Sequence, residues 1–279
     1  MKKGFIIAAV VLVSLGIIMF VVALAVSGFN LKGFGIEERI TKEVNISESF
    51  RDISIETTTA DIELKLSDNG SCRIVYDEVK NRPLKVVVED NTLKVKYADE
   101  RKWFERITLW TPKMSVTVYL PAAAFESVAA ASTTGDILIY DIEANNMALA
   151  VTTGDIRLYS VRLSKDLTAA VTTGKLSASD LTCRSLISDG STGDISLSNV
   201  VASERMDLKR NTGDVHFDKC DAANIKVKTS TGDVSGTLLS GKVFVAKSST
   251  GRVSVPDSSS GGQCEITTST GDIKLQVIS

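Results

Sequence analysis

Hydrophobic and polar positions recur with a period of 19 to 20 residues through the second half of the chain. Each period contains a glycine. The second residue after it is always apolar, the third is mostly polar and the fourth is again mostly apolar. This alternation is typical of a strand with one buried face. The apolar residues two positions after the glycines are Ile137, Ile156, Leu176, Ile195, Val215, Val234, Val253 and Ile273.

A second short strand is expected before each glycine, because apolar residues also stand seven and, mostly, five positions ahead of it. Each unit therefore holds two strands and has no room for a helix. One unit cannot bury its apolar face alone, whereas stacked units bury equivalent residues in continuous columns. We predict an all-β fold, a β-solenoid (β-helix) of about eight coils of 19 to 20 residues over residues 128–279.

The glycines themselves are predicted to be structural corners of the coils. Each follows a threonine, and glycine remains at all eight positions even where the aspartate that usually follows is replaced. A turn with positive φ explains this, since glycine adopts it without strain. The predicted repeat corners are Gly135, Gly154, Gly174, Gly193, Gly213, Gly232, Gly251 and Gly271.

The residue after each glycine is usually aspartate, which Lys175 and Arg252 replace in two units. Calcium-loaded β-rolls stack aspartates in this way, but they use a denser repeat of about nine residues. We favour capping of the turn by aspartate, with the two cations relieving repulsion. The hydroxyl pairs before the glycines, such as Thr133-Thr134, are interpreted as corner hydrogen bonding and β-propensity rather than as an ice-binding surface.

Residues 39–127 are predicted to form a divergent β region that caps the solenoid. Thr59-Ala60-Asp61-Ile62 is a degenerate copy of the repeat, and residues 84–97 are predicted to form a hairpin that turns at Asp90-Asn91. Further strands are expected at residues 107–110 and 115–121. The chain stops at Ser279 without an evident cap, so the C-terminal end is predicted to be a contact surface.

The N-terminal residues are the most apolar of the chain. After a short tail of residues 1–3, no charged residue occurs from Gly4 to Leu31, and about 20 apolar residues suffice to cross a bilayer. The stretch is longer than the apolar region of a signal peptide, although Ala23-Leu24-Ala25 has the form of a cleavage site. We predict an uncleaved transmembrane helix at residues 4–29, a linker at 30–38 and a single-pass protein of the cell membrane whose bulk is extracytoplasmic.

Composition and motifs do not favour catalysis. The net charge is −2, so the basic surplus of a nucleic-acid-binding protein is missing, and the chain has one histidine. His216 belongs to an outward polar column and is interpreted as a surface residue. Asp155, Asp194 and Asp214 could serve a polysaccharide-active β-helix enzyme as carboxylates, but the repeat accounts for them without chemistry. We predict no catalytic or metal site, no cofactor and no small-molecule substrate.

The cysteines and one aromatic pair are the remaining candidate residues. Cys220 and Cys264 fall in inward columns and are interpreted as buried hydrophobic residues, and no CxxC motif occurs. Trp103 and Phe104 lie in a charged stretch between strands. They are predicted either to fold back onto the core or to contact a partner or the membrane headgroups.

The apolar N-terminal span, the repeated T-[TS]-G-D-[IV]-x-[LV] coils and the upstream T-x-A-D-I-x-L sequence resemble the DUF4097 "putative adhesin" family over about residues 40–279. The resemblance implies a bacterial, surface-associated β-solenoid. The favoured function is a non-enzymatic binding or scaffolding surface at the cell envelope, with envelope polymers or another membrane or surface protein as partners. An envelope-stress sensor acting through a membrane partner, and the polysaccharide-active enzyme, are the alternatives.

Overall fold

The computed structural model describes residues 13–19, 21–22, 39–79, 82–98, 113–258 and 260–278. The chain divides into two compact units, of which the first comprises residues 1–38 and 101–112. In this unit residues 13–19 and 21–22 are helical. No helix within the described residues is both long and apolar enough to cross a membrane. The rest of the predicted transmembrane segment 4–29, the strand at 107–110 and the pair Trp103 and Phe104 lie outside the described residues.

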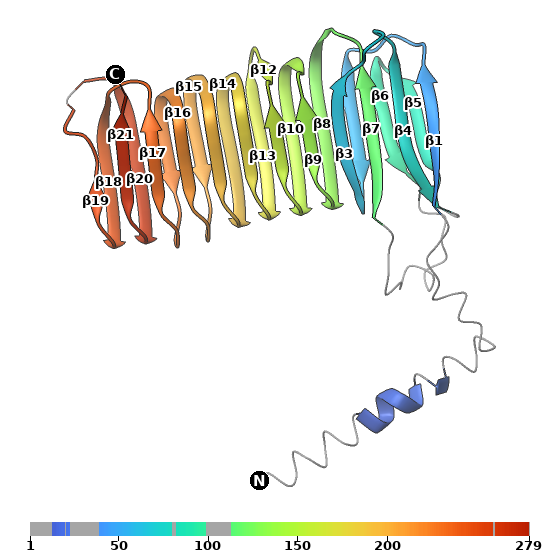
Figure 1. Ribbon diagram of the computed structural model, residues 1–279, viewed down its shortest axis with the longest axis horizontal. Coiled ribbons are helices and arrows are strands. Elements are labelled where there is room, and N and C mark those ends of the chain that lie inside the picture. The colour runs from blue at the N-terminus through green and yellow to red at the C-terminus, as the bar shows by residue number, and fades with distance from the viewer. Residues whose placement is uncertain are drawn as a thin grey trace. The chain divides into compact units, whose positions relative to one another are not determined.

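The second unit, residues 39–100 and 113–279, is a β-solenoid of about eight turns, which confirms the predicted fold class. Its strands form two walls that face each other across the core, and each coil is hydrogen-bonded to its neighbours (Figure 1). The strands of the first wall lie in the order β1 (Arg39–Ile46), β4 (Cys72–Val79), β7 (Met114–Leu120), β3 (Ala60–Leu66), β9 (Ile137–Tyr140), β11 (Ile156–Tyr159), β14 (Leu176–Thr192), β15 (Ile195–Lys209), β16 (Val215–Lys228), β17 (Val234–Leu238), β21 (Ile273–Val277) and β19 (Val253–Ser254).

The second wall runs alongside, and the long strands β14, β15 and β16 pass from the first wall into it. Nearly all pairings within both walls are parallel; the exceptions are β1–β4, β4–β7 and β5–β6. The order in the second wall is β5 (Leu84–Glu89), β6 (Thr92–Tyr97), β2 (Asp52–Thr57), β8 (Ala124–Thr134), β10 (Glu143–Thr153), β13 (Asp166–Thr173), the later parts of β14, β15 and β16, then β20 (Gly262–Thr270) and β18 (Lys242–Thr250); the short β12 (Arg162–Leu163) pairs with β10 and β14.

The core consists of the predicted apolar columns. Ile137 pairs with Ile156, Ile156 with Leu176 and Leu176 with Ile195, and all four side chains are fully buried. Burying one such side chain contributes about 1.5–3 kcal/mol, so the columns are the main source of stability. All four cysteines are free and buried. Cys220 and Cys264 occupy inward columns, as predicted.

The predicted glycine corners lie on one edge of the stack, where the chain passes from the second wall to the first. All eight glycines have positive φ, from +121° to +152°. A Cβ added at any of them would lie 1.9 to 2.4 Å from the carbonyl oxygen of the equivalent residue in an adjacent coil. Glycine is therefore required both by the turn and by the close stacking of one corner on the next.

The N-terminal part of the unit continues the solenoid with irregular strands. Ala60 begins β3 and occupies the glycine position below Gly135, as the degenerate repeat predicted. β5 and β6 form the predicted antiparallel hairpin, and Asp90 and Asn91 at its turn have φ of 50° and 62°. The buried carboxylate of Asp77 ties β4 to β7, because it accepts hydrogen bonds from the Ser115 amide at 3.0 Å and hydroxyl at 2.8 Å.

The C-terminal coils do not stack in sequence order. β20 lies between β16 and β18, so that Thr231 pairs with Thr270 rather than with Thr250. The prediction that the last residues form the uncapped end is therefore wrong. The end of the stack is formed by β18 and β19, where Val253 is 44% exposed. The repeat spacing predicts the alternation within a coil, but every coil offers similar columns to its neighbours, so the repeat pattern alone does not predict the stacking order.

Arg210 is the most deeply buried charged residue among the described residues. Arg210 is 1% exposed and points into the space left by Gly190 in the adjacent coil, where an added Cβ would lie 2.7 Å from its Nη1 atom. Its guanidinium donates to the Ser188 hydroxyl at 3.1 Å and to the Lys209 carbonyl at 2.9 Å. Burial lowers the pKa of Arg210.

Candidate functional site

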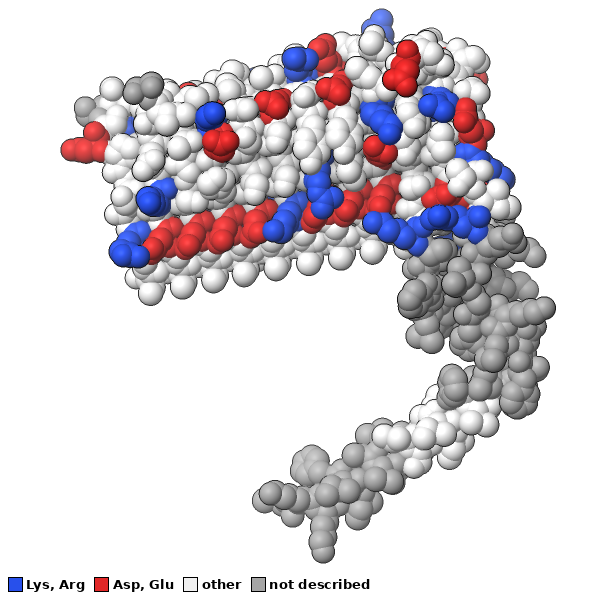
Figure 2. All heavy atoms as spheres, in the orientation of Figure 1, with Lys and Arg blue, Asp and Glu red and all other residues white. Residues whose placement is uncertain are grey.

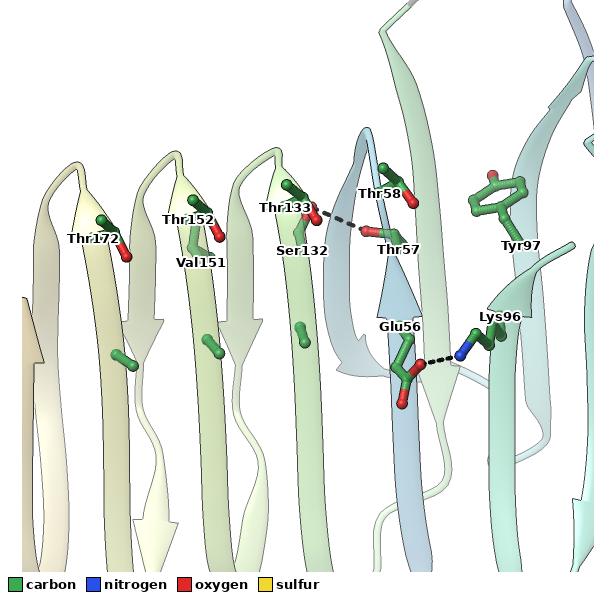
Figure 3. A pocket seen from close by; sticks show the side chains of 13 residues that line it. Glu56, Thr57, Thr58, Lys96, Tyr97, Ser132, Thr133, Val151, Thr152 and Thr172 are labelled. Atoms are coloured by element: carbon green, nitrogen blue, oxygen red, sulfur yellow. Dashed lines mark hydrogen bonds and ion pairs between the residues drawn. The ribbon is translucent and has the colours of Figure 1, made fainter. Parts of the chain in front are cut away.

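A groove crosses the outer surface of the second wall over β8, β10 and β13 (Figure 3). It encloses about 440 Å³. Its floor consists of Ala131, Ala150 and Ala170, which lie side by side on the three strands. A shallower extension follows the same strands away from the glycine corners, over Ala129 and Ala148. We refer to the hollow and its extension together as the alanine groove.

The local sequence explains why the wall is hollow here. In β10 the residues alternate between buried Met147, Leu149 and Val151 and exposed Ala148 and Ala150. The same alternation occurs in β8 and β13, so the outward rows of three consecutive coils consist largely of alanine. Small outward side chains between larger ones leave an open channel along the solenoid axis.

A row of threonines borders the floor on the side of the glycine corners. Thr58, Thr133, Thr152 and Thr172 come from four neighbouring coils and line the groove (Figure 3). Neighbouring strands lie about 4.8 Å apart, so the row offers one hydroxyl per coil at that spacing. The double hydroxyl column of the sequence therefore forms the rim of a groove at three of its coils.

One end of the groove is closed by β2 and β6. Lys96 and Glu56 form an ion pair across these strands, and Tyr97 stands beside it (Figure 3). The Tyr97 hydroxyl donates to the Asp77 carbonyl at 2.6 Å, which fixes the ring. Burial, assisted by the charge of Asp77, raises the pKa of Tyr97, so the phenol remains protonated and continues to donate.

The other end is marked by larger side chains on β14. Ile187 and Asp189 pair with Thr168 and Ala170 of β13 and interrupt the alanine rows. Asp189 forms an ion pair with Lys209 of the next coil at 3.1 Å. Both charged pairs at the ends of the groove are internally neutralised, so the groove carries no net charge.

The aspartates after the glycines form a column along the first wall, visible as the red row in Figure 2. Each aspartate accepts a hydrogen bond through Oδ1 from the backbone N–H of the next residue in the column, at 2.7 to 3.2 Å. The predicted capping of the aspartate's own turn is therefore wrong for these bonds, which join each coil to its neighbour instead. In spatial order the column is Asp61, Asp136, Asp155, Lys175, Asp194, Asp214, Asp233, Asp272 and Arg252, and the Lys113 side chain reaches its first member.

Cations occupy both ends and the middle of this column. Lys113 contacts Asp61 at 2.8 Å, Lys175 contacts Asp194 at 2.9 Å, and the exposed Arg252 reaches Asp272 at 3.5 Å. Arg157 in addition bridges two aspartates of the column. Burial disfavours the charged form of Asp136, but the Asp155 amide and the Arg157 guanidinium outweigh it and lower the pKa of Asp136.

The remaining residues considered from the sequence do not converge on the groove. Asp155, Asp194 and Asp214 lie in the column of the first wall, and His216 is exposed there with Nδ1 3.1 Å from the Ser235 hydroxyl. Within the described part of the chain, no cluster of three or more histidine, cysteine, aspartate or glutamate residues has the arrangement of a metal site. The alanine groove itself was not predicted; outward alanines in three successive units were its signal.

Comparison with known proteins agrees with this architecture. Residues 50–180 and 162–278 match the family model described as Toastrack DUF4097. The chain belongs to this family. Two overlapping matches fit a repetitive DUF4097 solenoid in which one coil resembles the next. No curated protein matches the chain.

Solved structures similar to this DUF4097 chain come from several bacteria. A "putative lipid binding protein" from Parabacteroides distasonis is 18% identical, with a TM-score of 0.57 over 86% of this chain and 97% of that one. A "putative adhesin" from Bacteroides fragilis is 15% identical over 86% and 97%, with a TM-score of 0.42. Another "putative adhesin", from Parabacteroides merdae, is 14% identical over 86% and 96%, with a TM-score of 0.39. The first of these similarities supports the fold.

Proposed function

We propose that this DUF4097 protein is a membrane-anchored, extracytoplasmic solenoid that binds a component of the cell envelope through the alanine groove. The observation that carries the proposal is the groove itself, an open hollow of about 440 Å³ whose floor and rim come from successive coils. The rigid stack behind it holds the floor and the threonine rim in fixed register, as a binding surface requires.

The lining of the hollow favours binding over catalysis. Glycoside hydrolysis ordinarily uses two carboxylic acids that flank the bond. Glu56 is the one carboxylate lining the hollow, and it is paired with Lys96. Alanine methyl groups and threonine hydroxyls supply contacts without a nucleophile and base in reach of each other. Names such as "putative adhesin" among similar structures are compatible with this role.

Binding is tested with the full chain in detergent micelles, immobilised and exposed to envelope fragments. We expect the wild-type chain to retain envelope fragments. The Ala150→Trp variant, whose indole fills the floor, should retain at least about tenfold less. The matched control is Ser196→Trp, which places the same side chain on the exposed surface of the first wall. Equal retention by the two variants would contradict the role of the groove.

Anchoring and orientation rest on the uncharged stretch from Gly4 to Leu31. Because all four native cysteines are buried, a single exposed cysteine can report on topology. In spheroplasts carrying Ser196→Cys, we expect a membrane-impermeant maleimide to label the chain before lysis. Labelling that requires lysis would place the solenoid on the cytoplasmic side, and recovery of the chain in the soluble fraction would refute the anchor.

A further inference from the structure

We infer that the ligand of the alanine groove is an uncharged linear polysaccharide that lies along the solenoid axis. This inference rests on the proposed function, because it specifies the chemical class that the same groove accepts. Four properties of the groove lead to it: its length, its fully paired backbone, its parallel rows of methyl and hydroxyl groups, and its neutrality.

Length excludes a single small ring as the best ligand. The alanine groove extends from β2 across β8, β10 and β13 to β14, which is four strand spacings. At about 4.8 Å per spacing the two end strands are about 19 Å apart, and the three floor strands between them span about 10 Å. An extended chain of several units uses this length, whereas one ring would contact a single coil pair.

The backbone of the groove is not available to a peptide strand. The three floor strands are each paired on both sides, β8 with β2 and β10, and β13 with β10 and β14. Strand addition requires an unpaired sheet edge, so the floor cannot bind an extended peptide in that way. Recognition depends on side chains alone.

These side chains present two parallel rows of different chemistry. The floor row, Ala131, Ala150 and Ala170, is apolar, and the rim row of Thr133, Thr152 and Thr172 supplies one hydroxyl donor and acceptor per coil (Figure 3). A sugar chain has the complementary form, because each ring carries a face of C–H groups and an edge of hydroxyls. Lys96 and Glu56 at the closed end add polar atoms that can contact the hydroxyls of a terminal sugar.

Charge selects among polysaccharides. An ion pair stands at each end, Glu56 with Lys96 and Asp189 with Lys209. Within each pair the two charges cancel, and the rows between the pairs are uncharged. No cation cluster is present among the lining residues to hold a phosphate or uronate. A neutral chain therefore fits better than an anionic one, and a sugar chain uses the threonine row, which a lipid acyl chain would not.

The test measures binding of defined oligosaccharides to the full chain in detergent micelles by saturation-transfer NMR and calorimetry. The probes are cellohexaose and N-acetylchitohexaose as neutral chains, hexagalacturonate as an anionic chain, and glucose as a single ring. We expect at least one neutral hexasaccharide to bind more tightly than hexagalacturonate and glucose, by about tenfold or more. Tighter binding of hexagalacturonate, or no binding of either neutral chain, would overturn the inference.

Variants locate the site. We expect Thr152→Val, which removes one rim hydroxyl, to weaken binding about fivefold, and Ala150→Trp to abolish it. Ser269→Ala, at the equivalent corner position outside the groove, and Ser196→Trp are controls that should bind like wild type. Thermal unfolding verifies that each variant folds. Unchanged binding by both groove variants would refute the assignment, as would displacement of the sugar by phosphatidylglycerol vesicles.

The result of the oligosaccharide-binding test can be distinguished from the result of the envelope-retention test. Retention of envelope fragments without binding of either neutral hexasaccharide would leave the groove as an adhesive surface and reject the polysaccharide. Binding of a neutral hexasaccharide that Thr152→Val weakens, combined with no retention of envelope fragments, would support the ligand class and reject adhesion to the envelope.

Discussion

Each regular coil turns at two corners, and the two solve the same problem with different residues. At the first corner the eight glycines have φ between +121° and +152°. At the opposite corner, where the first wall ends, five successive coils place a non-glycine residue at φ between 52° and 56°. These residues are Asp141, Ser160, Asp180, Asn199 and Lys219.

The difference teaches that two exclusions act together at the glycine corner: a φ outside the left-handed α region, and close stacking on the adjacent coil. The second corner uses the left-handed α region, which L-residues enter at a modest cost and asparagine and aspartate enter most easily. Its side chains point into solvent, as the exposed Asp141, Asp180 and Asn199 indicate. At the glycine corner the carbonyl of the adjacent coil occupies the place of a Cβ, so no side chain fits there.

The largest effect is expected from Gly174→Ala at the first corner. The new Cβ would lie 1.9 Å from the Gly154 carbonyl oxygen at a φ of +140°. Backbone strain and overpacking together should lower the free energy of unfolding by roughly 3 to 5 kcal/mol. Denaturant unfolding followed by circular dichroism measures this change.

A second glycine variant lacks the stacking contribution. Gly70→Ala also introduces a Cβ at positive φ, +71°, but no atom lies within 4 Å of it. We expect a loss of about 1 kcal/mol, from strain alone. If both variants lost the same stability, close stacking would not explain the glycine column.

A smaller effect of opposite sign is expected at the second corner. Lys219 has φ of 52° without the local side-chain hydrogen bonding that favours asparagine or aspartate there. Lys219→Gly relieves this strain, while the backbone amide can still donate to the Thr237 hydroxyl at 2.9 Å. The free energy of unfolding should rise by up to about 1 kcal/mol, offset in part by the greater freedom of unfolded glycine. A loss of more than that amount would contradict the comparison.

The glycine corner was predictable from the sequence, and the second corner was not. Where a backbone carbonyl excludes every side chain, glycine recurs in each coil, and the recurrence is visible as a period in the sequence. A preference satisfied by aspartate, serine, asparagine or lysine leaves no constant letter. The inward columns followed from alternation for the same reason as the glycines, since burial excludes charge from them.

Relations between coils were also beyond the sequence. Arg210 stands in an inner column between Gly190 and Thr229, and the absent side chain of Gly190 makes room for it. The insertion of β20 between β16 and β18 is equally invisible, because Thr250 and Thr270 are interchangeable as partners of Thr231. The alanine groove could be predicted only from the register of neighbouring strands, which places the outward alanines of three coils side by side.

The smallest expected effect on stability comes from the charged residues that follow the corner glycines, such as Asp194 and its partner Lys175. The hydrogen bond from the Lys175 ammonium, followed by that from the Asp214 amide, lowers the pKa of Asp194 below its ordinary value of 3.8. A carboxyl with a lowered pKa in the folded state adds stability above its ordinary pKa, and this stability is lost as pH falls through the folded-state pKa.

Lys175→Met should therefore raise the pKa of Asp194, measured by NMR titration of its carboxyl carbon, and reduce the acid dependence of unfolding below pH 4. Lys175→Arg should keep the pKa low, because it retains the charge. Both side chains are more than a third exposed, so added salt should shrink the difference between the two variants. A pKa that stays low in Lys175→Met would mean that the Asp214 amide alone sets it. The column would then be held by the backbone bonds between coils, and its cations would matter little to the corner that glycine makes possible.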